Sequence, residues 1–116
     1  MDLTVVIASI ESARSITQCL NHMTLACAGL RAEIIVADAS HDDTQARVNA
    51  LMGSSILIAC PPGTVAPQLW AAGFRRASGR VVAFTTGHCL VSPAWATSLL
   101  KAIGDGAAGA GGPLVL

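Results

Sequence analysis

Charged and aromatic side chains are both scarce in this sequence. Charged residues make up 12% of its 116 residues, seven basic and seven acidic residues give a formal net charge of zero, and aromatic residues make up 3%. A surface that binds nucleic acid needs clustered Lys and Arg for the phosphates, and often aromatic rings for the bases. The composition therefore argues against nucleic acid as a partner.

Long hydrophobic runs are also absent. Apolar residues make up 53% of the chain, but Gly, Pro and charged residues interrupt every run before it reaches the roughly 18 to 20 residues that cross a bilayer. The first residues, Met1 to Val6, lack the basic n-region of a signal peptide. We therefore expect no membrane span in this chain and a cytoplasmic location.

The four cysteines are far apart, with no C-x-x-C pair and no dense pattern of a secreted disulfide scaffold. We expect them to be reduced. Cys19, Cys27 and Cys60 suit the role of small buried hydrophobes, and Cys89 alone borders a candidate site.

Two common phosphate-binding motifs are missing. Ala8-Ser9-Ile10-Glu11-Ser12 stands after the first expected strand, where a dinucleotide-binding protein carries G-x-G-x-x-G, and G-x-x-x-x-G-K-[ST] occurs nowhere. These absences argue against an ordinary Rossmann dinucleotide enzyme and against a P-loop NTPase.

Strand and helix patterns, by contrast, alternate along the whole chain. The predicted strands cover residues 3–10, 33–38, 55–60 and 80–85, and the predicted helices cover 12–28, 42–52, 67–77 and 92–103. Short connections between them favour an α/β fold, a mostly parallel sheet with helices on both faces. No linker or repeat divides the chain, so we expect one domain, residues 1–116.

The segment from Glu33 to Thr44 carries the clearest functional signal. An apolar, β-branched run ends at Asp38, which places this acid at the carboxyl edge of the sheet, where α/β proteins bind small molecules. Ser40 has the pattern of a helix N-cap, with Asp43 completing a capping box. For Asp42 and Asp43, helix capping explains the acids as well as a functional role does. For Asp38 we predict a ligand role.

Four segments in order resemble family 2 glycosyltransferases, which have the GT-A fold. They are TVVIAS at 4–9, EIIVADASHDDT at 33–44, GRVVAF at 79–84 and VSPAW at 91–95. The resemblance covers essentially the whole chain. It implies the Rossmann-like, amino-terminal half of that domain, which binds the nucleotide sugar.

The resemblance also implies roles for individual residues. Ser9, Glu11 and Asp38 match the positions that hold the base and ribose of the nucleotide, and a carboxylate accepts hydrogen bonds from a ring N–H or from ribose hydroxyls. In the family an Asp-x-Asp motif after the fourth strand holds the diphosphate through a divalent metal, Mn²⁺ or Mg²⁺.

This chain departs from the family at that motif, because Thr86, Gly87 and His88 occupy the aligned positions. None of them supplies an anionic oxygen. His88 is a candidate Mn²⁺ ligand or phosphate donor, with a structural role as the alternative, and Thr86 is a candidate phosphate donor. In the third helix Trp70 precedes Gly73, where the family often has an Arg-Asn pair. Gly73 suits close packing, and Trp70 suits the core or a pocket wall.

The last residues, from Gly109 to Leu116, have the pattern of a loop that enters an apolar strand. We therefore expect a fragment, an incomplete domain whose unfinished sheet edge favours self-association.

Two functions from different classes follow. The first is a glycosyltransferase, or its donor-binding portion, which moves a sugar from a nucleoside diphosphate sugar to an acceptor hydroxyl. By resemblance its general base lies in a carboxyl-terminal half, so no catalytic residue is assigned here. The alternative is a non-catalytic, degenerate or truncated binding module. A third, weaker reading is another nucleotide binder with Ser40 and Asp43 facing phosphate.

Overall fold

The computed structural model describes residues 1–51 and 55–104, and in this part of the chain strands and helices alternate as the patterns predict. The elements are β1 (Leu3–Ser9), α1 (Ile16–Ala26), β2 (Ala32–Asp38), α2 (Thr44–Ala50), β3 (Ser55–Ala59), α3 (Ala66–Arg76), β4 (Val81–Thr86) and α4 (Trp95–Gly104). The strands form one sheet in the order β3-β2-β1-β4, and each neighbouring pair is parallel. The predicted α/β class is confirmed.

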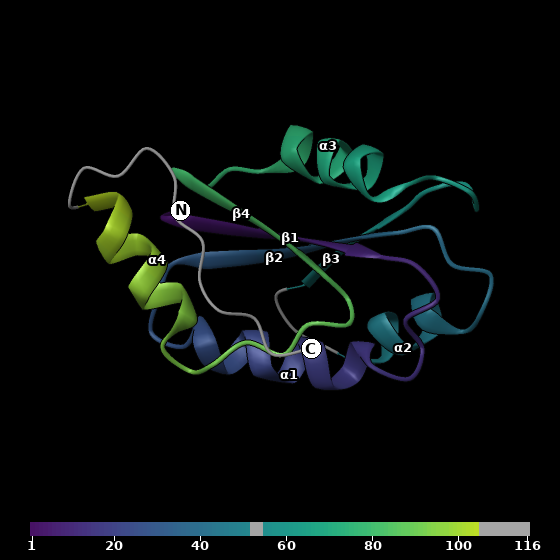
Figure 1. Ribbon diagram of the computed structural model, residues 1–116, viewed down its shortest axis with the longest axis horizontal. Coiled ribbons are helices and arrows are strands. Elements are labelled where there is room, and N and C mark those ends of the chain that lie inside the picture. Colours follow the sequence, from purple (N-terminus) through teal and green to yellow (C-terminus); the bar gives the residue numbers. More distant parts are fainter. Residues whose placement is uncertain (52–54, 105–116) are drawn as a thin grey trace.

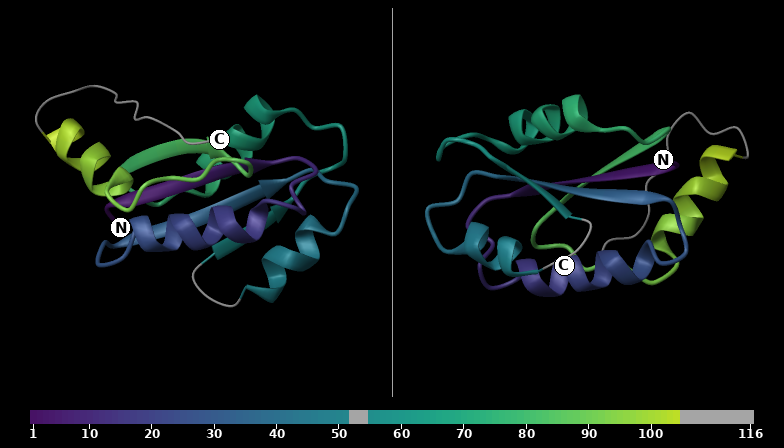
Figure 2. Two further views of the ribbon diagram at one scale, coloured as in Figure 1. Left: turned by 60° about the horizontal axis from the view of Figure 1, so that its bottom comes forward. Right: turned by 180° about the vertical axis from the view of Figure 1, so that it is seen from behind.

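Helices cover both faces of the sheet (Figure 1). Among the helices that the structure describes, α3 lies by itself on one face, while α1, α2 and α4 lie on the other, an arrangement that is also visible from behind in Figure 2. The larger core cluster lies between the sheet and the group of α1, α2 and α4, and a smaller cluster that includes Leu69 lies under α3. The chain therefore buries the sheet on two sides.

The central strand β1 is buried along its whole length. Alternate residues face opposite layers, so Val5 and Ile7 join the larger cluster, while Ala8 joins the smaller one under α3. The helix α3 approaches very closely at Gly73, where a Cβ atom would collide with the Val6 side chain. The predicted packing role of this glycine is confirmed.

The inward face of α1 is the one that its spacing predicts, since Ile16, Leu20, Met23 and Cys27 are all buried. The helix begins at Ile16 rather than at the predicted Ser12. Residues 12 and 13 are held outside the helix because their backbone N–H groups donate to the side chains of Thr44 and Asp42, at 3.1 and 3.3 Å.

The start of α2 corrects a second prediction. Ser40 is not its N-cap, because the helix begins at Thr44 and the Ser40 hydroxyl donates to Asp38 instead. Asp43 stands at the N-cap without a side-chain capping bond, so the predicted capping box is wrong as well. Asp42 supplies the side-chain hydrogen bond at the start of α2, since its carboxylate accepts the Thr44 N–H at 3.0 Å and also the Thr44 hydroxyl.

A network around Glu33 closes the amino edge of the sheet. Its carboxylate accepts hydrogen bonds from the Thr4 hydroxyl at 2.6 Å, and from the Ser78 N–H and hydroxyl at 2.6 and 2.8 Å. The Gly79 N–H in turn donates to the Thr4 hydroxyl at 2.8 Å. One carboxylate thus joins β2 to β1 and to the segment that leads into β4.

Glu33→Gln is expected to reduce the acid sensitivity of the fold. Burial acts to raise the pKa of Glu33, but the hydrogen bonds from Thr4 and Ser78 together outweigh it and lower the pKa below its usual range. The ionised carboxylate therefore stabilises the native state above the pKa of glutamate in the unfolded chain, about 4.3. This stability is lost as the pH falls through the lower pKa of Glu33 in the native state. Urea unfolding across this pH range should show that the free energy of unfolding falls less with acid for Glu33→Gln than for the natural chain.

The half-buried Asp2 offers a control for that experiment, since it lies at the same edge and pairs only loosely with Arg31, at 3.8 Å. Asp2→Asn should leave the acid profile of unfolding close to that of the natural chain. If acidification lowered the free energy of unfolding equally in the natural chain and in Glu33→Gln, the stabilising role of Glu33 would be contradicted.

The cysteines are free thiols, as the sequence predicts; Cys19, Cys27 and Cys89 are buried and Cys60 is half-buried. Burial raises the pKa of Cys19 to about 12, with a further contribution from the neighbouring Cys89. Cys19 is therefore a neutral hydrophobe at physiological pH and not a nucleophile.

Some predictions fall outside the described residues. These are the end of the second helix at Met52 and Gly53, the strand predicted at the end of the chain, and the self-association inferred from it. Within residues 1–51 and 55–104, no helix has the length and apolar character needed to cross a membrane.

Candidate functional site

The predicted site residues meet at the carboxyl edge of the sheet. Because all four strands run parallel, the loops after β1, β2, β3 and β4 lie at this edge, on the right in Figure 1. Ser9 and Asp38 are direct neighbours in the register of β1 and β2. The chain order reverses between β1 and β4, so the switch point at which α/β sheets bind ligands lies between Ser9 to Glu11 and Thr86 to His88.

Asp38 is fully buried at the end of β2 and has three protein donors. Its Oδ1 accepts the Ser40 hydroxyl at 2.7 Å, and its Oδ2 accepts the Ser40 N–H at 3.1 Å and the Gln45 side-chain amide at 3.0 Å. A carboxylate has about four acceptor positions, so one remains. The half-buried Gln45, in the first turn of α2, covers the carboxylate on that side.

Glu11 links the first loop to the second. Its backbone N–H donates to the Ser40 hydroxyl at 2.8 Å, and its side-chain Oε1 accepts the His41 N–H at 2.5 Å. Glu11 has a φ of 48°, a left-handed conformation that non-glycine residues seldom adopt. These two bonds hold it in that conformation, so Asp38, Ser40 and Glu11 form one continuous network.

Ser9 lies beside this network, with its hydroxyl fully buried and without a hydrogen-bond partner among the described residues. The Thr85 hydroxyl, near the end of β4, is in the same state. A buried hydroxyl without a partner costs free energy, and such groups are uncommon in proteins. Both therefore remain available to a bound water molecule or to a polar group of a ligand.

His88 links the loop after β4 to the loop after β1. Its Nε2 lies 3.3 Å from the Ile10 carbonyl oxygen, and its Nδ1 lies 3.1 Å from the Ser15 hydroxyl, although the ring is exposed. The Ser15 hydroxyl lies closer still, at 2.9 Å, to the Gly87 carbonyl oxygen. In this arrangement His88 ties the loop after β4 to the loop after β1.

Thr86 and Gly87 complete the turn after β4. The Thr86 hydroxyl lies 3.1 Å from the sulfur of the buried Cys89, so this cysteine contacts the turn after β4. Gly87 packs so tightly that a Cβ atom would lie 2.7 Å from the Ser12 hydroxyl oxygen. A larger residue at position 87 would therefore have to displace Ser12.

A divalent metal does not fit the side chains at this turn. Mg²⁺ and Mn²⁺ require hard oxygen ligands, usually carboxylates. In the part of the chain that the structure describes, no three His, Cys, Asp or Glu side chains are grouped as metal ligands. Both nitrogens of His88 already face protein atoms, and the Thr86 hydroxyl faces a sulfur.

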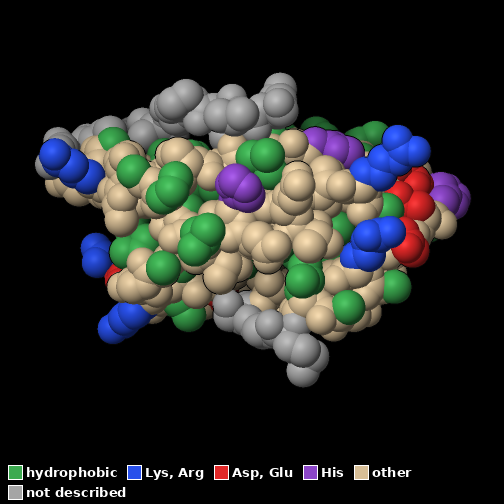
Figure 3. Space-filling view, turned by 90° about the horizontal axis from the view of Figure 1, so that it is seen from below, with side chains coloured by type: hydrophobic (Ala, Val, Ile, Leu, Met, Phe, Trp, Pro, Cys, Tyr) green, Lys and Arg blue, Asp and Glu red, His purple; other side chains and the backbone are tan. Residues whose placement is uncertain are grey.

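Charged side chains nevertheless gather near the candidate site. Figure 3 shows acidic, basic and histidine side chains at one end of the face formed by α1, α2 and α4. The exposed charged and histidine residues of the first two loops and the start of α2 are Glu11, Arg14, His41, Asp42, Asp43 and Arg47. Arg47 pairs with Asp43 at 3.2 Å. The Asp42 carboxyl has a lowered pKa, mainly through the Thr44 hydroxyl, and is therefore ionised.

Trp70 is half-buried and belongs to the smaller core cluster. Its indole N–H donates to the Thr85 carbonyl oxygen at 2.9 Å, and its ring packs on Phe84 with the ring centres 6.0 Å apart. The core alternative for Trp70 is thus confirmed, and it helps to hold α3 against β4.

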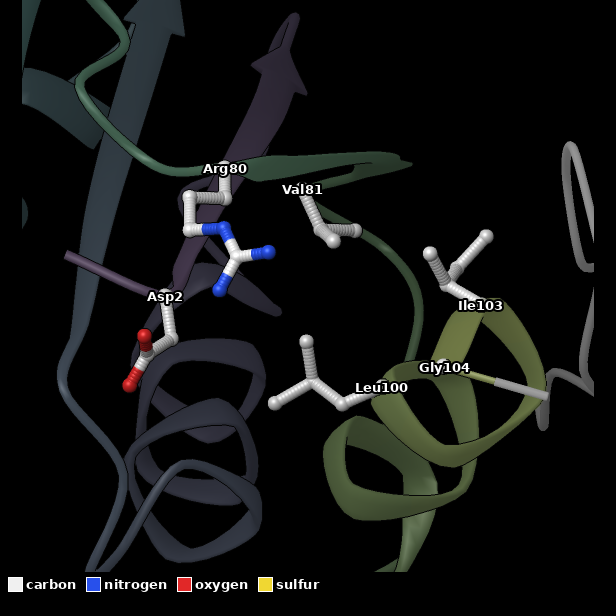
Figure 4. Close-up of a pocket in the computed structure, with 6 residues that line it drawn as sticks. All are labelled: Asp2, Arg80, Val81, Leu100, Ile103 and Gly104. Atoms are coloured by element: carbon white, nitrogen blue, oxygen red, sulfur yellow. The ribbon is translucent and has the colours of Figure 1, made fainter. Parts of the chain in front are cut away.

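A cavity of about 350 Å³ lies at the opposite, amino edge of the sheet. Figure 4 shows the apolar side chains of Val81, Leu100 and Ile103 on one side of it, and Arg80 and Asp2 near its other wall. Its lining includes none of the predicted site residues, so it is separate from the candidate site.

Sequence reasoning missed Gln45, Ser12 and Ser15, which hold the site residues in place. Each lies in or near the first turn of a helix that follows a strand, and in a βα unit this turn lies over the carboxyl edge. That position is the one signal that could have identified them. Their partners depend on the loop conformation, which no spacing in the sequence reveals.

Comparisons with known proteins agree with this architecture. The family model described as Glycosyl transferase family 2 matches residues 4–115. Two crystal structures of S. aureus TarS share the fold, one with a TM-score of 0.77 and 19% identity, and the other, of TarS 1-349, with 0.76 and 18%. Each alignment covers 90% of this chain, but only 20% and 33% of those two chains. No curated protein matches the sequence.

Proposed function

Because this chain belongs to glycosyl transferase family 2, we propose that it binds a nucleoside diphosphate sugar at the carboxyl edge of its sheet, for transfer of the sugar to an acceptor hydroxyl. The observation that carries this proposal is the buried Asp38 at the end of β2, joined through Ser40 to Glu11. Burying a carboxylate is costly, so its retention at the ligand-binding edge supports a functional role.

Asp38 contacts the ligand at the position that the Gln45 amide occupies. Oδ2 accepts the Gln45 amide at 3.0 Å, and a ring N–H of the base or a ribose hydroxyl is a donor of the same kind. Gln45 is half-buried and extends from the first turn of a short helix, so its side chain can turn outward. The unpaired Ser9 hydroxyl, next to Asp38 in the register, supplies a second polar contact.

Isothermal titration calorimetry with UDP and GDP tests the proposal. One of the two nucleotides should give saturable heat, and a ligand at about 100 times its Kd should add about 2.7 kcal/mol to stability and raise the Tm by about 10 °C. Inorganic pyrophosphate is the control ligand, because it lacks the base and ribose that Asp38 would hold. Absence of heat and of a Tm shift with both nucleotides would overturn the proposal.

A non-catalytic binding module is the second candidate. The replacement of the acidic motif by Thr86, Gly87 and His88 favours it, because the described residues supply no carboxylate at the end of β4. A module of this kind would leave the nucleotides unbound, whereas the donor-binding portion of a glycosyltransferase would bind one of them. The calorimetric titration therefore separates the two candidates, because it does not depend on turnover.

A further inference from the structure

We infer that the cavity at the amino edge of the sheet binds a small carboxylic acid that carries an apolar tail. The volume of the cavity, about 350 Å³, lies in the range of pockets that hold small ligands, about 300 to 1,000 Å³. The candidate nucleotide site lies at the opposite edge of the sheet, so this inference does not depend on the proposed function.

The apolar wall of the cavity comes from two elements that the core holds in place. Val81 begins β4, and Leu100 and Ile103 lie in the second half of α4. Val81 and Leu100 also pack against the larger core cluster. The Val81 N–H donates to the Asp2 carbonyl oxygen at 3.2 Å, which fixes the start of the strand. The wall is therefore formed before a ligand arrives, and this lowers the cost of binding.

Arg80 supplies a cationic group on the other side of the cavity. Its backbone N–H donates to the Met1 carbonyl oxygen at 3.2 Å, which holds the residue beside the start of β4. Figure 4 shows its guanidinium group on the side that faces Val81 and Leu100. Arg80 is exposed and makes no ion pair with the described residues. A guanidinium group in this position can bind a carboxylate through two parallel hydrogen bonds.

Asp2 limits the charge of the ligand. Its carboxylate is turned away from Leu100 and Ile103 in Figure 4, and it pairs loosely with Arg31, at 3.8 Å. A ligand bound to Arg80 would still have this acid nearby, and the repulsion grows with the negative charge of the ligand. This favours a carboxylate, which has one negative charge, over a phosphate monoester, which has about 1.5 to 2.

Titration calorimetry with sodium octanoate, below the concentration at which it forms micelles, tests the inference. We expect saturable binding to the natural chain. Hexanoate and butyrate should bind more weakly, by up to about fourfold for each CH₂ group removed, because the apolar wall buries less of the tail. A natural chain without saturable octanoate binding, or an affinity that does not depend on tail length, would overturn the inference.

Arg80→Gln should weaken octanoate binding about tenfold, the effect of losing a hydrogen bond between charged groups, and Arg80→Lys should recover part of the affinity. Arg80 is exposed, so neither substitution should lower the Tm. Octanol has a similar tail without the charge, and it should bind the natural chain and Arg80→Gln equally. Equal octanoate affinity in Arg80→Gln and the natural chain would contradict the assignment of the carboxylate to Arg80.

Arg75→Gln is the matched control. Arg75 is also exposed, but it lies in the last turn of α3, on the other face of the sheet from α4. Its octanoate affinity should equal that of the natural chain, and a tenfold loss in this variant as well would show that octanoate responds only to the net charge of the protein. None of these outcomes bears on the proposed function, which the UDP and GDP titrations test at the carboxyl edge.

Discussion

Asp38→Ala is expected to weaken nucleotide binding by about 10- to 150-fold, because the hydrogen bond between a charged group and its partner contributes about 1.5 to 3 kcal/mol. The loss should be the same for UDP and for uridine, since the contact proposed for Asp38 is with the base and ribose and not with the phosphates. Calorimetry with both ligands measures it.

The Asp38 variant needs two controls, because its alanine leaves Ser40 and Gln45 without their acceptor. The first is Asp2→Ala, which removes a half-buried acid at the other edge of the sheet and should leave binding unchanged. The second is Gln45→Ala, which removes the amide that occupies Oδ2 while the carboxylate stays. If Asp38 contacts the ligand directly, Gln45→Ala should bind nucleotide more tightly than the natural chain. Weaker binding in Gln45→Ala would show that Asp38 serves only to shape the loop.

Gly79→Ala is expected to cause the largest loss of stability. A Cβ atom at this position would lie 2.5 Å from the backbone nitrogen of Thr4 and 2.6 Å from the carbonyl carbon of Leu3. Both atoms belong to the central strand, so they cannot move aside as a flexible side chain could. Overpacking of this kind costs about 3 kcal/mol, a large part of the 5 to 15 kcal/mol that is typical of a domain. Thermal unfolding should show a Tm about 10 to 20 °C lower.

Gly104→Ala is the matched control for this substitution. Among the described residues, no atom lies within 4 Å of the Cβ position of Gly104, at the end of α4, and its φ is not left-handed. Alanine is the better helix former by up to about 1 kcal/mol, so this variant should unfold at the same temperature as the natural chain or at a higher one. Equal Tm values for Gly79→Ala and the natural chain would disprove the close approach to β1.

Most of the fold was predictable because it depends on local patterns. Apolar periodicity located all eight elements, and the buried faces of α1 and β1 follow directly from spacings of 3.6 and 2 residues. Alternation with short connections then favoured a parallel sheet. The errors lie at the starts of α1, α2 and α4, and α4 begins at Trp95 rather than at residue 92. At α1, the distant side chains of Asp42 and Thr44 compete for the backbone N–H groups.

The candidate site was predictable only as a group of positions. The sequence placed Ser9, Glu11, Asp38, Thr86 and His88 at the ends of their strands, and the parallel topology brings those ends to one edge. It did not predict that Gln45 closes Asp38, or that His88 bridges to Ile10 and Ser15. These contacts join residues of separate loops, and a local pattern carries no information about them.

The amino-acid sequence by itself determined the order and type of the elements, the acid at the end of β2 and the missing carboxylates after β4, because each is a property of residue type and spacing along the chain. The tertiary structure alone decided which of those groups meet. The strand order β3-β2-β1-β4 places the switch point between β1 and β4, and there the loop from Glu11 to Ser15 packs between Asp38 and His88. Hydrogen bonds between residues about 30 to 70 positions apart form only after the sheet has brought its loops together.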